Sequence, residues 1–359
     1  MSGLDWGRVA YWVWRSRSPG AAATRLLLIP AAALYRAGAG ARNAAFDTGL
    51  RRSRALPLPS LGVGNLAVGG TGKTPVTAYL ARQLARRGLR PAVLLRGYGR
   101  DEEREHAAAV PEAIVVADPD RHAAAARAAA AGAEVLVLDD CFQRRDVTVD
   151  VMLTVVAAET WNGLRLPLPA GPWREGAGAL GRADAVVVTC KTATAADGDA
   201  LAAVLAPRTR GGLGIVVRLA PAGFRSLGAR EPLAAEVVSG RDVVALCAIG
   251  EPELFATQLE RLGARVTLAA FGDHHAYAAA DVAAARARAG ASGLVVTTAK
   301  DAVKLEQMWP VGDPQCLVME LEVRPAGKPA ALDALLDRVA AAARGTTNPE
   351  AATRPSRPS

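Results

Sequence analysis

Residues 64–75 form the stretch of this sequence whose residue types and spacing are best suited to chemistry. Glycines in such a loop let backbone N–H groups curl around phosphate oxygens without Cβ clashes. Lys73 can then reach the β- and γ-phosphates of a nucleotide, and the Thr74 hydroxyl can bind Mg²⁺. The candidate phosphate-binding residues are therefore Ala67, Val68, Gly69, Gly70, Thr71, Gly72, Lys73 and Thr74.

Ala67 stands where the usual phosphate-loop pattern has its first glycine. The alternative is a glycine-rich turn that contains Gly-Lys-Thr by chance. The context favours phosphate binding, because an apolar strand is expected at residues 61–64 and a helix is expected to begin at Pro75. The positive end of that helix would face the same phosphates.

The second chemical signal is the pair Asp139 and Asp140, which directly follows an apolar stretch at residues 135–138. Phosphoryl-transfer enzymes with such a loop need an acid at a strand end to hold Mg²⁺ or its waters. Two adjacent aspartates can also cap the start of a helix. Because a phosphate loop precedes them in the chain, we interpret both as candidate metal ligands.

Apolar strands and helical stretches alternate along most of the chain. Further strands are expected at residues 92–95, 114–117, 151–156 and 185–189, with a helix at 121–131. Around residues 219–242 the pattern becomes irregular and rich in Pro and Gly. A second series comes after it, with strands at 243–248, 266–270 and 294–298, and helices at 279–289 and 330–343. The alternation predicts an α/β fold with a parallel sheet covered on both faces.

These patterns divide the chain into five expected segments. They are a basic, apolar arm that associates with a membrane (1–54), a P-loop kinase-type domain (55–220), a linker (221–241), a second, smaller α/β domain (242–344) and a disordered tail rich in Pro, Thr and Ser (345–359).

The arm carries most of the formal net charge of +8. Its nine arginines face only Asp5 and Asp47, whereas the remainder of the chain is nearly neutral. That distribution argues against a nucleic-acid partner. The apolar run at residues 26–35 is about half the ~20 residues that a spanning helix needs, and it contains Pro30. Together with Trp6, Trp12 and Trp14, the run predicts an amphipathic segment in the headgroup layer; the alternative is a buried N-terminal helix with a basic rim.

The four cysteines are far apart and show no zinc-site spacing, so we expect reduced thiols in a cytosolic body. No feature of the sequence indicates an oligomeric state.

Six motifs in fixed order resemble those of the tetraacyldisaccharide 4′-kinase family, over about residues 55–305. They are Val63-Gly64-Asn65-Leu66 leading into Gly69-Gly70-Thr71-Gly72-Lys73-Thr74-Pro75; Arg96-Gly97-Tyr98-Gly99; Asp139-Asp140-Cys141-Phe142-Gln143; Leu168-Pro169-Ala170-Gly171-Pro172-Trp173-Arg174-Glu175; Phe271-Gly272-Asp273-His274-His275; and Thr297-Thr298-Ala299-Lys300-Asp301.

The resemblance implies a lipid kinase with ATP and Mg²⁺ as cofactors. Its substrate would be a disaccharide-1-phosphate lipid, a lipid A precursor phosphorylated on the 4′-hydroxyl. The family fold has two α/β/α domains joined by a linker with the nucleotide between them. The resemblance also implies a location at the cytoplasmic face of the bacterial inner membrane. This location agrees with the membrane association expected for the arm.

The resemblance also assigns roles to single residues. Asp101 matches the proposed base of a Gly-Asp-Glu motif, although Arg100 replaces the glycine, and His274 matches its assisting histidine. Gln143 would orient the phosphoryl group or the waters of the metal. Arg174 would neutralise transferring charge or grip the lipid phosphate, the alternative being a surface ion pair with Glu175. Without the resemblance, Asp101 would be interpreted as a solvated charge, and His106 and His122 are expected at the surface.

Other departures from the family are Leu95, Cys141, Arg144 and Ala299, where Ser, Gly, His and Glu are usual. They concern the substrate more than the reaction. Two other classes of protein remain open at this point. One is a membrane-associated P-loop switch NTPase, which would hydrolyse nucleotide without lipid. The other is a non-catalytic binding module.

Overall fold

The computed structural model of the chain describes residues 6–97, 100–273, 275–290, 293–310, 315–327 and 329–346. Most of its strands join one large sheet. Its path is β12 (Arg265–Ala270), β11 (Asp242–Cys247), β13 (Leu294–Thr298), β14 (Gln315–Ala326), β9 (Leu213–Ser226), β8 (Ala185–Cys190), β7 (Val151–Ala157), β2 (Ser60–Asn65), β5 (Val135–Leu138), β3 (Pro91–Leu95) and β4 (Ile114–Ala117). A short strand, β10 (Pro232–Leu233), pairs with β9. β1 (Arg54–Ala55) and β6 (Val147–Thr148) pair separately.

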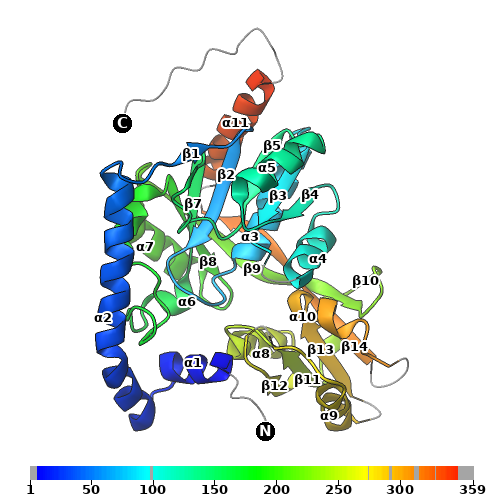
Figure 1. Ribbon diagram of the computed structural model, residues 1–359. Coiled ribbons are helices and arrows are strands. Elements are labelled where there is room, and N and C mark those ends of the chain that lie inside the picture. Colours follow the sequence, from blue (N-terminus) through cyan, green and yellow to red (C-terminus); the bar gives the residue numbers. More distant parts are fainter. Residues whose placement is uncertain are drawn as a thin grey trace.

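Neighbouring strands are parallel on both sides of one antiparallel junction. The strands from β9 to β4 form one parallel half, and those from β14 to β12 form the other. β14 and β9 are antiparallel and join the two halves, which lie one above the other in Figure 1. The expected α/β fold with a mostly parallel sheet is therefore confirmed.

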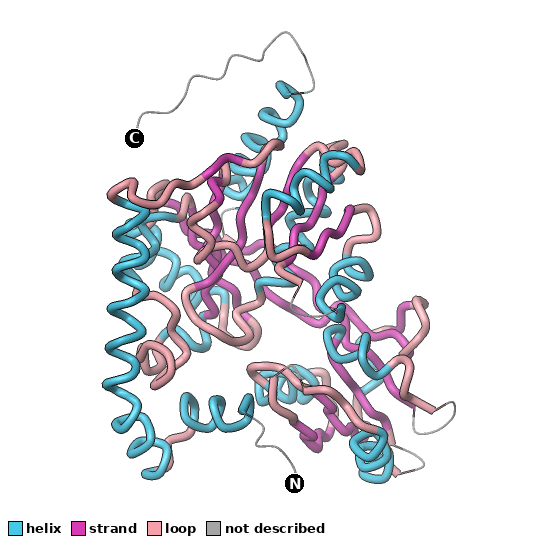
Figure 2. Tube along the Cα trace, in the orientation of Figure 1, coloured by secondary structure: helices cyan, strands magenta, loops and turns pink. Residues whose placement is uncertain are grey.

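Helices alternate with the strands in the order that a parallel sheet requires, and Figure 2 shows them on both sides of it. In the first half these are α3 (Lys73–Arg86), α4 (Arg100–Ala109), α5 (Arg121–Ala130), the short α6 (Ala158–Trp161) and α7 (Ala195–Leu205). In the second half they are α8 (Pro252–Arg261), α9 (Ala279–Ala289) and α10 (Ala299–Leu305). Each expected strand is present to within one residue at either end.

The expected linker at residues 221–241 is only partly irregular. β9 continues through the expected boundary to Ser226, and β10 and a short 3-10 helix (Ala235–Val238) occupy part of the chain between Ser226 and β11. Pro221 and Gly223 argued against a strand here. The ladder accommodates them with a bulge, because Glu320 pairs with Gly223 whereas Leu321 pairs with Pro221.

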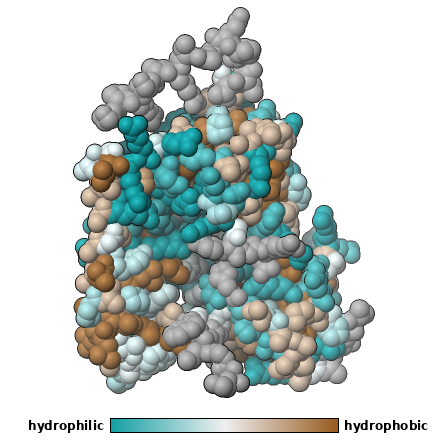
Figure 3. Space-filling view, viewed as in Figure 1, coloured by the Kyte–Doolittle hydropathy of each residue, from teal (hydrophilic) through white to brown (hydrophobic). Residues whose placement is uncertain are grey.

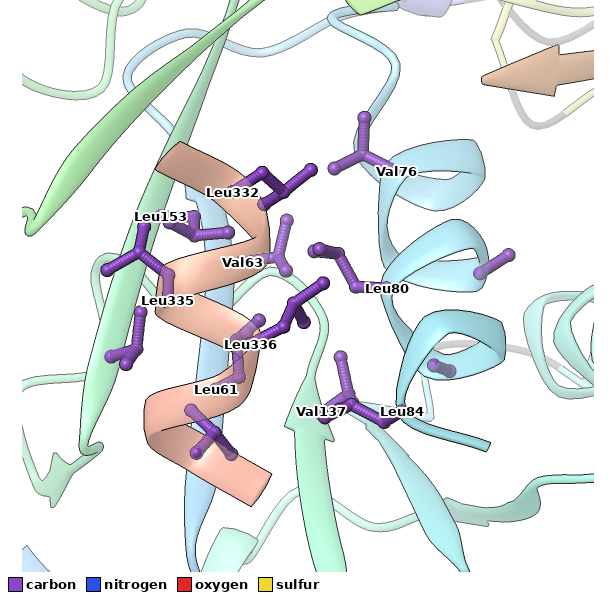
Figure 4. Packing of buried hydrophobic residues seen from close by; sticks show 14 of the residues in the cluster. Leu61, Val63, Val76, Leu80, Leu84, Val137, Leu153, Leu332, Leu335 and Leu336 are labelled. Atoms are coloured by element: carbon purple, nitrogen blue, oxygen red, sulfur yellow. The ribbon is translucent and has the colours of Figure 1, made fainter. Parts of the chain in front are cut away.

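The last helix, α11 (Pro329–Thr346), packs in the first half of the sheet, although the sequence placed it in the second domain. Its leucines meet α3 and the central strands, among them Leu80 of α3 and Leu61 of β2 (Figure 4). The chain thus returns to its first half after completing the second. The helix also extends two residues into the expected tail, whose remainder lies outside the described residues.

The N-terminal arm consists of two helices, α1 (Trp6–Arg15) and α2 (Pro19–Asp47). Ser18 caps α2 by accepting a hydrogen bond from the Ala21 amide, and Pro19 occupies its first turn. Figure 1 shows α2 standing along one side of the molecule and α1 reaching from its lower end toward α8. Within the described residues, no helix combines the length and apolar character needed to span a bilayer.

Candidate functional site

The glycine-rich loop connects the central strand β2 with α3. It contains six of the eight candidate phosphate-binding residues, and the other two begin α3. Gly72 precedes the helix in a left-handed conformation (φ +84°), and a Cβ there would lie 2.4 Å from a Leu219 methyl group. Asn65 donates from Nδ2 to the Thr71 hydroxyl (3.0 Å), and the Thr71 carbonyl accepts from the Thr189 hydroxyl (2.9 Å). The loop is therefore held by buried polar contacts on both sides.

Lys73 and Thr74 are the first two residues of α3, two positions earlier than the helix start expected at Pro75. Both side chains consequently lie in the first turn, where the unpaired backbone N–H groups and the helix dipole favour anions. Gly69, also with positive φ (+116°), has open space around its Cβ position. The lysine, the threonine hydroxyl and the free backbone N–H groups therefore lie together at the start of α3, where they can bind phosphate oxygens.

The expected carboxylate pair lies beside this helix start. β5 is hydrogen-bonded to β2 in the sheet, and Asp139 and Asp140 directly follow it. Lys73 Nζ lies 3.4 Å from Asp140 Oδ1. Burial alone would raise the pKa of Asp140, but the charges of Lys73 and Arg174 outweigh it and lower this pKa. Asp140 is therefore ionised at neutral pH.

Arg174 belongs to the same cluster. Its Nη1 donates to both oxygens of Asp140 (2.9 and 3.0 Å) and to Gln143 Oε1 (3.2 Å). The alternative of a surface ion pair with Glu175 is wrong, since Glu175 pairs with Arg182 at 2.8 Å. A cation that reaches the acid beside Lys73 is well placed to balance charge there.

Gln143 ties the cluster to the root of the loop. Its Nε2 donates to the Asn65 carbonyl (2.9 Å) and to Glu175 (3.2 Å). The side chain therefore spans the ends of two neighbouring strands, β2 and β5.

His106 was expected at the surface, and this expectation is wrong. The side chain is buried, with 1% of the residue exposed, and its Nε2 lies 3.0 Å from Asp139 Oδ2. Burial would lower the pKa of His106, but the hydrogen bond and charge of Asp139 outweigh it and raise this pKa. Burial alone would raise the pKa of Asp139, but His106 and Lys73 outweigh this effect and lower the pKa. The carboxylate is therefore the favoured form. The two side chains form a buried, charge-assisted pair.

The sequence concealed His106 because it follows a run of charged residues that suggests a solvated helix face. Arg121 was missed as well. It is buried with 1% exposure, and its Nη2 donates to the Asp139 carbonyl (2.9 Å). A buried arginine needs partners, and here it fixes the backbone that carries the two aspartates.

The structure describes the expected general base and its assisting histidine only in part. Asp101 lies in the first turn of α4, and its side chain is outside the described part of the structure, as are Arg100's side chain and the whole of His274. α4 packs against α10. Lys300 of α10 pairs with Asp273 (2.5 Å), and Lys304 donates to the His275 carbonyl (3.0 Å). The helix that carries Asp101 and the loop that contains His274 thus share one neighbour, α10.

Glu105 lies one helical turn after Asp101, on the side of α4 close to α10. Burial raises the pKa of Glu105 to about 7, although the charges of His106 and Lys300 oppose that shift. Helix α4 therefore carries, four residues after the expected base, an acid whose pKa is close to neutral pH.

A further contact with the loop comes from residues that the sequence did not single out. Lys191, after β8, donates to the Gly70 carbonyl and lies 2.6 Å from Glu251 Oε2. Glu251, before α8 and 5% exposed, also accepts from Arg15 of the arm (3.2 Å). One carboxylate thus connects the arm, the glycine loop and the second half of the sheet.

The oxygen donors at the loop fit Mg²⁺. Thr74, Asp139 and Asp140 offer hydroxyl and carboxylate oxygens, and Mg²⁺ is usually bound by one or two carboxylates together with waters and substrate phosphates. Within the residues that the structure describes, no three or more His, Cys, Asp and Glu side chains form a metal-binding group.

A central parallel strand that leads through a glycine-rich loop into a helix, with acids at the end of the next strand, is the arrangement of α/β enzymes that bind nucleotide phosphates. Comparisons with known proteins define the group more closely. The family model described as tetraacyldisaccharide-1-P 4′-kinase (LpxK) matches residues 24–112 and 106–341. The chain belongs to this family.

Individual relatives agree. A tetraacyldisaccharide 4′-kinase from Anaeromyxobacter dehalogenans (strain 2CP-C) is 38% identical over 334 residues, covering 85% of this chain and 87% of the relative. One from Methylobacterium sp. (strain 4-46) is 38% identical over 341 residues, covering 90% and 95%. The crystal structure of LpxK from Aquifex aeolicus, described as an "apo" form in complex with ATP, has a TM-score of 0.68 and 25% identity, covering 88% of this chain and 99% of that one.

Proposed function

We propose that this protein transfers the γ-phosphoryl group of ATP to the 4′-hydroxyl of a tetraacyldisaccharide 1-phosphate in lipid A biosynthesis. The observation that carries the proposal is the cluster of Lys73, Asp140 and Arg174 at the glycine loop, with Lys73 Nζ 3.4 Å from Asp140. Family membership supplies the substrate class.

The chemistry requires positioning and charge neutralisation more than covalent catalysis. The loop amides and Lys73 bind the β- and γ-phosphates, and Gln143 orients the phosphoryl group. Thr74 and Asp139, with Asp140, would hold Mg²⁺, which when bound neutralises charge on the phosphates. Lys73 and Arg174 contact the same carboxylate, Asp140, so both cations lie where negative charge develops.

Asp101 accepts the proton of the sugar hydroxyl, and His274 assists it; both roles are carried over from the family resemblance. The packing of α4 on α10, which also holds the loop at residues 271–275, supports a base and a partner that work together. Because these residues come from the two halves of the sheet, relative movement of the halves would regulate access to the base.

We propose that the arm attaches the enzyme to the cytoplasmic face of the inner membrane. Leu26, Leu27 and Leu34 of α2 are 72%, 81% and 75% exposed, and Arg25 and Arg36 flank them. Figure 3 shows apolar surface on the side of the molecule where the arm lies. An apolar helix surface bordered by arginines suits an anionic leaflet.

Transfer of labelled phosphate from ATP to a detergent-dispersed tetraacyldisaccharide 1-phosphate tests the function directly. We expect transfer by the wild-type protein and a loss on the order of 100-fold or more in Asp101→Asn, since general bases contribute about 10²–10⁴ in rate. Nucleotide affinity should remain normal. Glu103→Gln, an exposed acid on the same helix, is the matched control and should retain activity.

Two outcomes would contradict the proposal. Hydrolysis of ATP at full rate without lipid, unaffected by Asp101→Asn, would identify a switch NTPase instead. Equal transfer by Asp101→Asn and Glu103→Gln would remove Asp101 from the mechanism.

A further inference from the structure

Five arginines line a hollow to which the phosphoryl transfer assigns no role. Its volume is about 310 Å³, and its basic lining consists of Arg42, Arg51, Arg96, Arg144 and Arg145. These side chains come from the end of α2, the segment after it, and the loops that follow β3 and β5. We name this hollow the arginine pocket.

The arginine pocket lies at the edge of the sheet where ligands bind in α/β proteins. β3 and β5 are adjacent and parallel, and Arg96 and Arg144 follow their carboxyl ends. Ligands of open α/β sheets occupy the crevice outside these ends. The pocket therefore opens on the same edge of the sheet as the glycine loop.

Gln143 links the pocket to the phosphoryl-transfer cluster. Its side chain accepts from Arg174 (3.2 Å), while its main-chain carbonyl accepts a hydrogen bond from Arg42 of the pocket. Gln143 is also one of the residues that line the pocket. A ligand in the pocket would therefore lie one residue away from the group that contacts Asp140.

The positive charge of the pocket is only partly balanced. Arg144 pairs with Asp146 (2.8 Å), and Arg145 pairs with Asp47 (2.7 Å). Arg42 and Arg51 form no ion pair within the described part of the chain. At least two guanidinium groups are thus available to an anion, and their planar forks match phosphate oxygens.

Apolar surface adjoins the pocket on the same helix. Leu34 of α2 is 75% exposed and precedes Arg42 by eight residues, or about 12 Å along the axis. In Figure 3, hydrophilic side chains gather beside the upper end of α2 and apolar ones lie below them. A basic pocket next to an exposed apolar helix surface suits a ligand that carries a phosphate at one end and acyl chains beside it.

We propose that the arginine pocket binds the 1-phosphate of the disaccharide lipid, a phosphate monoester that stays on the substrate while the 4′-hydroxyl is phosphorylated. This assignment rests on the proposed function. The glycine loop and Lys73 serve the nucleotide phosphates, whereas the arginine pocket serves the phosphate that marks the correct lipid. It makes the enzyme selective for disaccharides that already carry a phosphate at the reducing end, so a reaction that installs or preserves this group must precede it.

The test compares two lipids and two double variants. The lipids are the tetraacyldisaccharide 1-phosphate and the same lipid without its phosphate, both detergent-dispersed. The pocket variant is Arg42→Gln with Arg51→Gln. The control is Arg52→Gln with Arg54→Gln, two exposed arginines, which removes the same charge from the same arm outside the pocket lining. Equilibrium binding of each lipid is measured beside turnover, with thermal unfolding as a check on folding.

We expect the pocket variant to raise KM and Kd for the phosphorylated lipid about tenfold or more, because each lost charged hydrogen bond weakens binding by about that factor. kcat and KM for ATP should not change. Wild-type protein should prefer the phosphorylated lipid, and the pocket variant should lose that preference. The control should keep it.

Turnover with equal preference in wild type and pocket variant would overturn the proposal. Preserved discrimination in binding without any turnover would leave the arginine pocket in place and refute the kinase function instead. The headgroup of a membrane phospholipid is the other source of phosphate. If it occupied the pocket, the pocket variant would lose binding to phosphatidylglycerol vesicles more than the control does, with lipid preference unchanged, and that result also overturns the proposal.

Discussion

The two long terminal helices, α2 and α11, are both rich in Ala and Leu but differ in what covers them. α11 buries Leu332, Leu335, Leu336 and Val339 against the first half of the sheet. α2, with 29 residues, buries only Ala21 and Ala32 and exposes three of its four leucines. The spacing of apolar residues explains the difference, since α11 repeats them every three or four positions and α2 has a continuous run. The apolar stripe of α11 is covered by protein, whereas the apolar run of α2, flanked by arginines, stays on the surface that we propose to bind a membrane.

Among the changes that test this comparison of α2 with α11, we expect the largest effect on the free energy of unfolding. Leu336→Ala should lower the free energy of unfolding by about 2–5 kcal/mol, because it leaves a cavity between α11 and the central strands (Figure 4). Chemical denaturation monitored by circular dichroism measures it. Ala334→Ser, on the exposed side of the same helix, is the control. A change under about 1 kcal/mol for Leu336→Ala would mean that α11 is not part of the core.

Replacing the exposed leucines of α2 should weaken membrane binding and leave the free energy of unfolding nearly unchanged. Leu27→Ser with Leu34→Ser should reduce co-sedimentation with anionic vesicles roughly tenfold, because exposed apolar side chains supply the insertion energy. The free energy of unfolding should change by no more than about 0.5 kcal/mol per substitution. Leu164→Ser with Val204→Ser, which are 58% and 59% exposed elsewhere, is the control. Equal vesicle binding by both double variants would contradict the assignment of α2.

The smallest effect concerns the ion pairs between α3 and α11. Arg87 contacts Asp333 (2.7 Å) and Asp337 (2.8 Å), whose side chains are 57% and 68% exposed. Solvent screening weakens such pairs, so Arg87→Ala should cost less than about 1 kcal/mol of unfolding free energy, and added salt should reduce the difference between variant and wild type. A loss comparable to that of Leu336→Ala would show that charge, not the leucine stripe, holds α11.

Much of the first half of the molecule was predictable because local signals agreed there. Continuous apolar runs flanked by turn residues identified β2, β5 and β7, and the glycine spacing identified the loop. β9 was not predicted, and its part from residue 219 onward was interpreted as irregular, Pro- and Gly-rich sequence that includes Pro221 and Gly223. Its pairing with β14 brings together residues about a hundred positions apart, and no local signal encodes that contact.

In the candidate site, too, some features were predicted from the sequence and others only became apparent in the structure. Lys73, Asp140, Gln143 and Arg174 were each predicted, and the structure brings them together. The sequence left Arg174 open between a role on a phosphate and a surface ion pair with Glu175. Its contact with Asp140 excludes only the ion pair. The roles of Asp101 and His274 stay predictions, since their side chains lie outside the described part of the structure.

The amino-acid sequence alone determined the α/β class, the phosphate loop, the acids at the strand end and the basic arm, because each depends on residues that are close together in the chain. Tertiary structure decided which distant groups meet. His106 meets Asp139, Glu251 meets both Lys191 and Arg15, and Arg42 of α2 lies near the arginines that follow β3 and β5. A buried charge requires a partner, but which partner it finds depends on how the strands and helices pack.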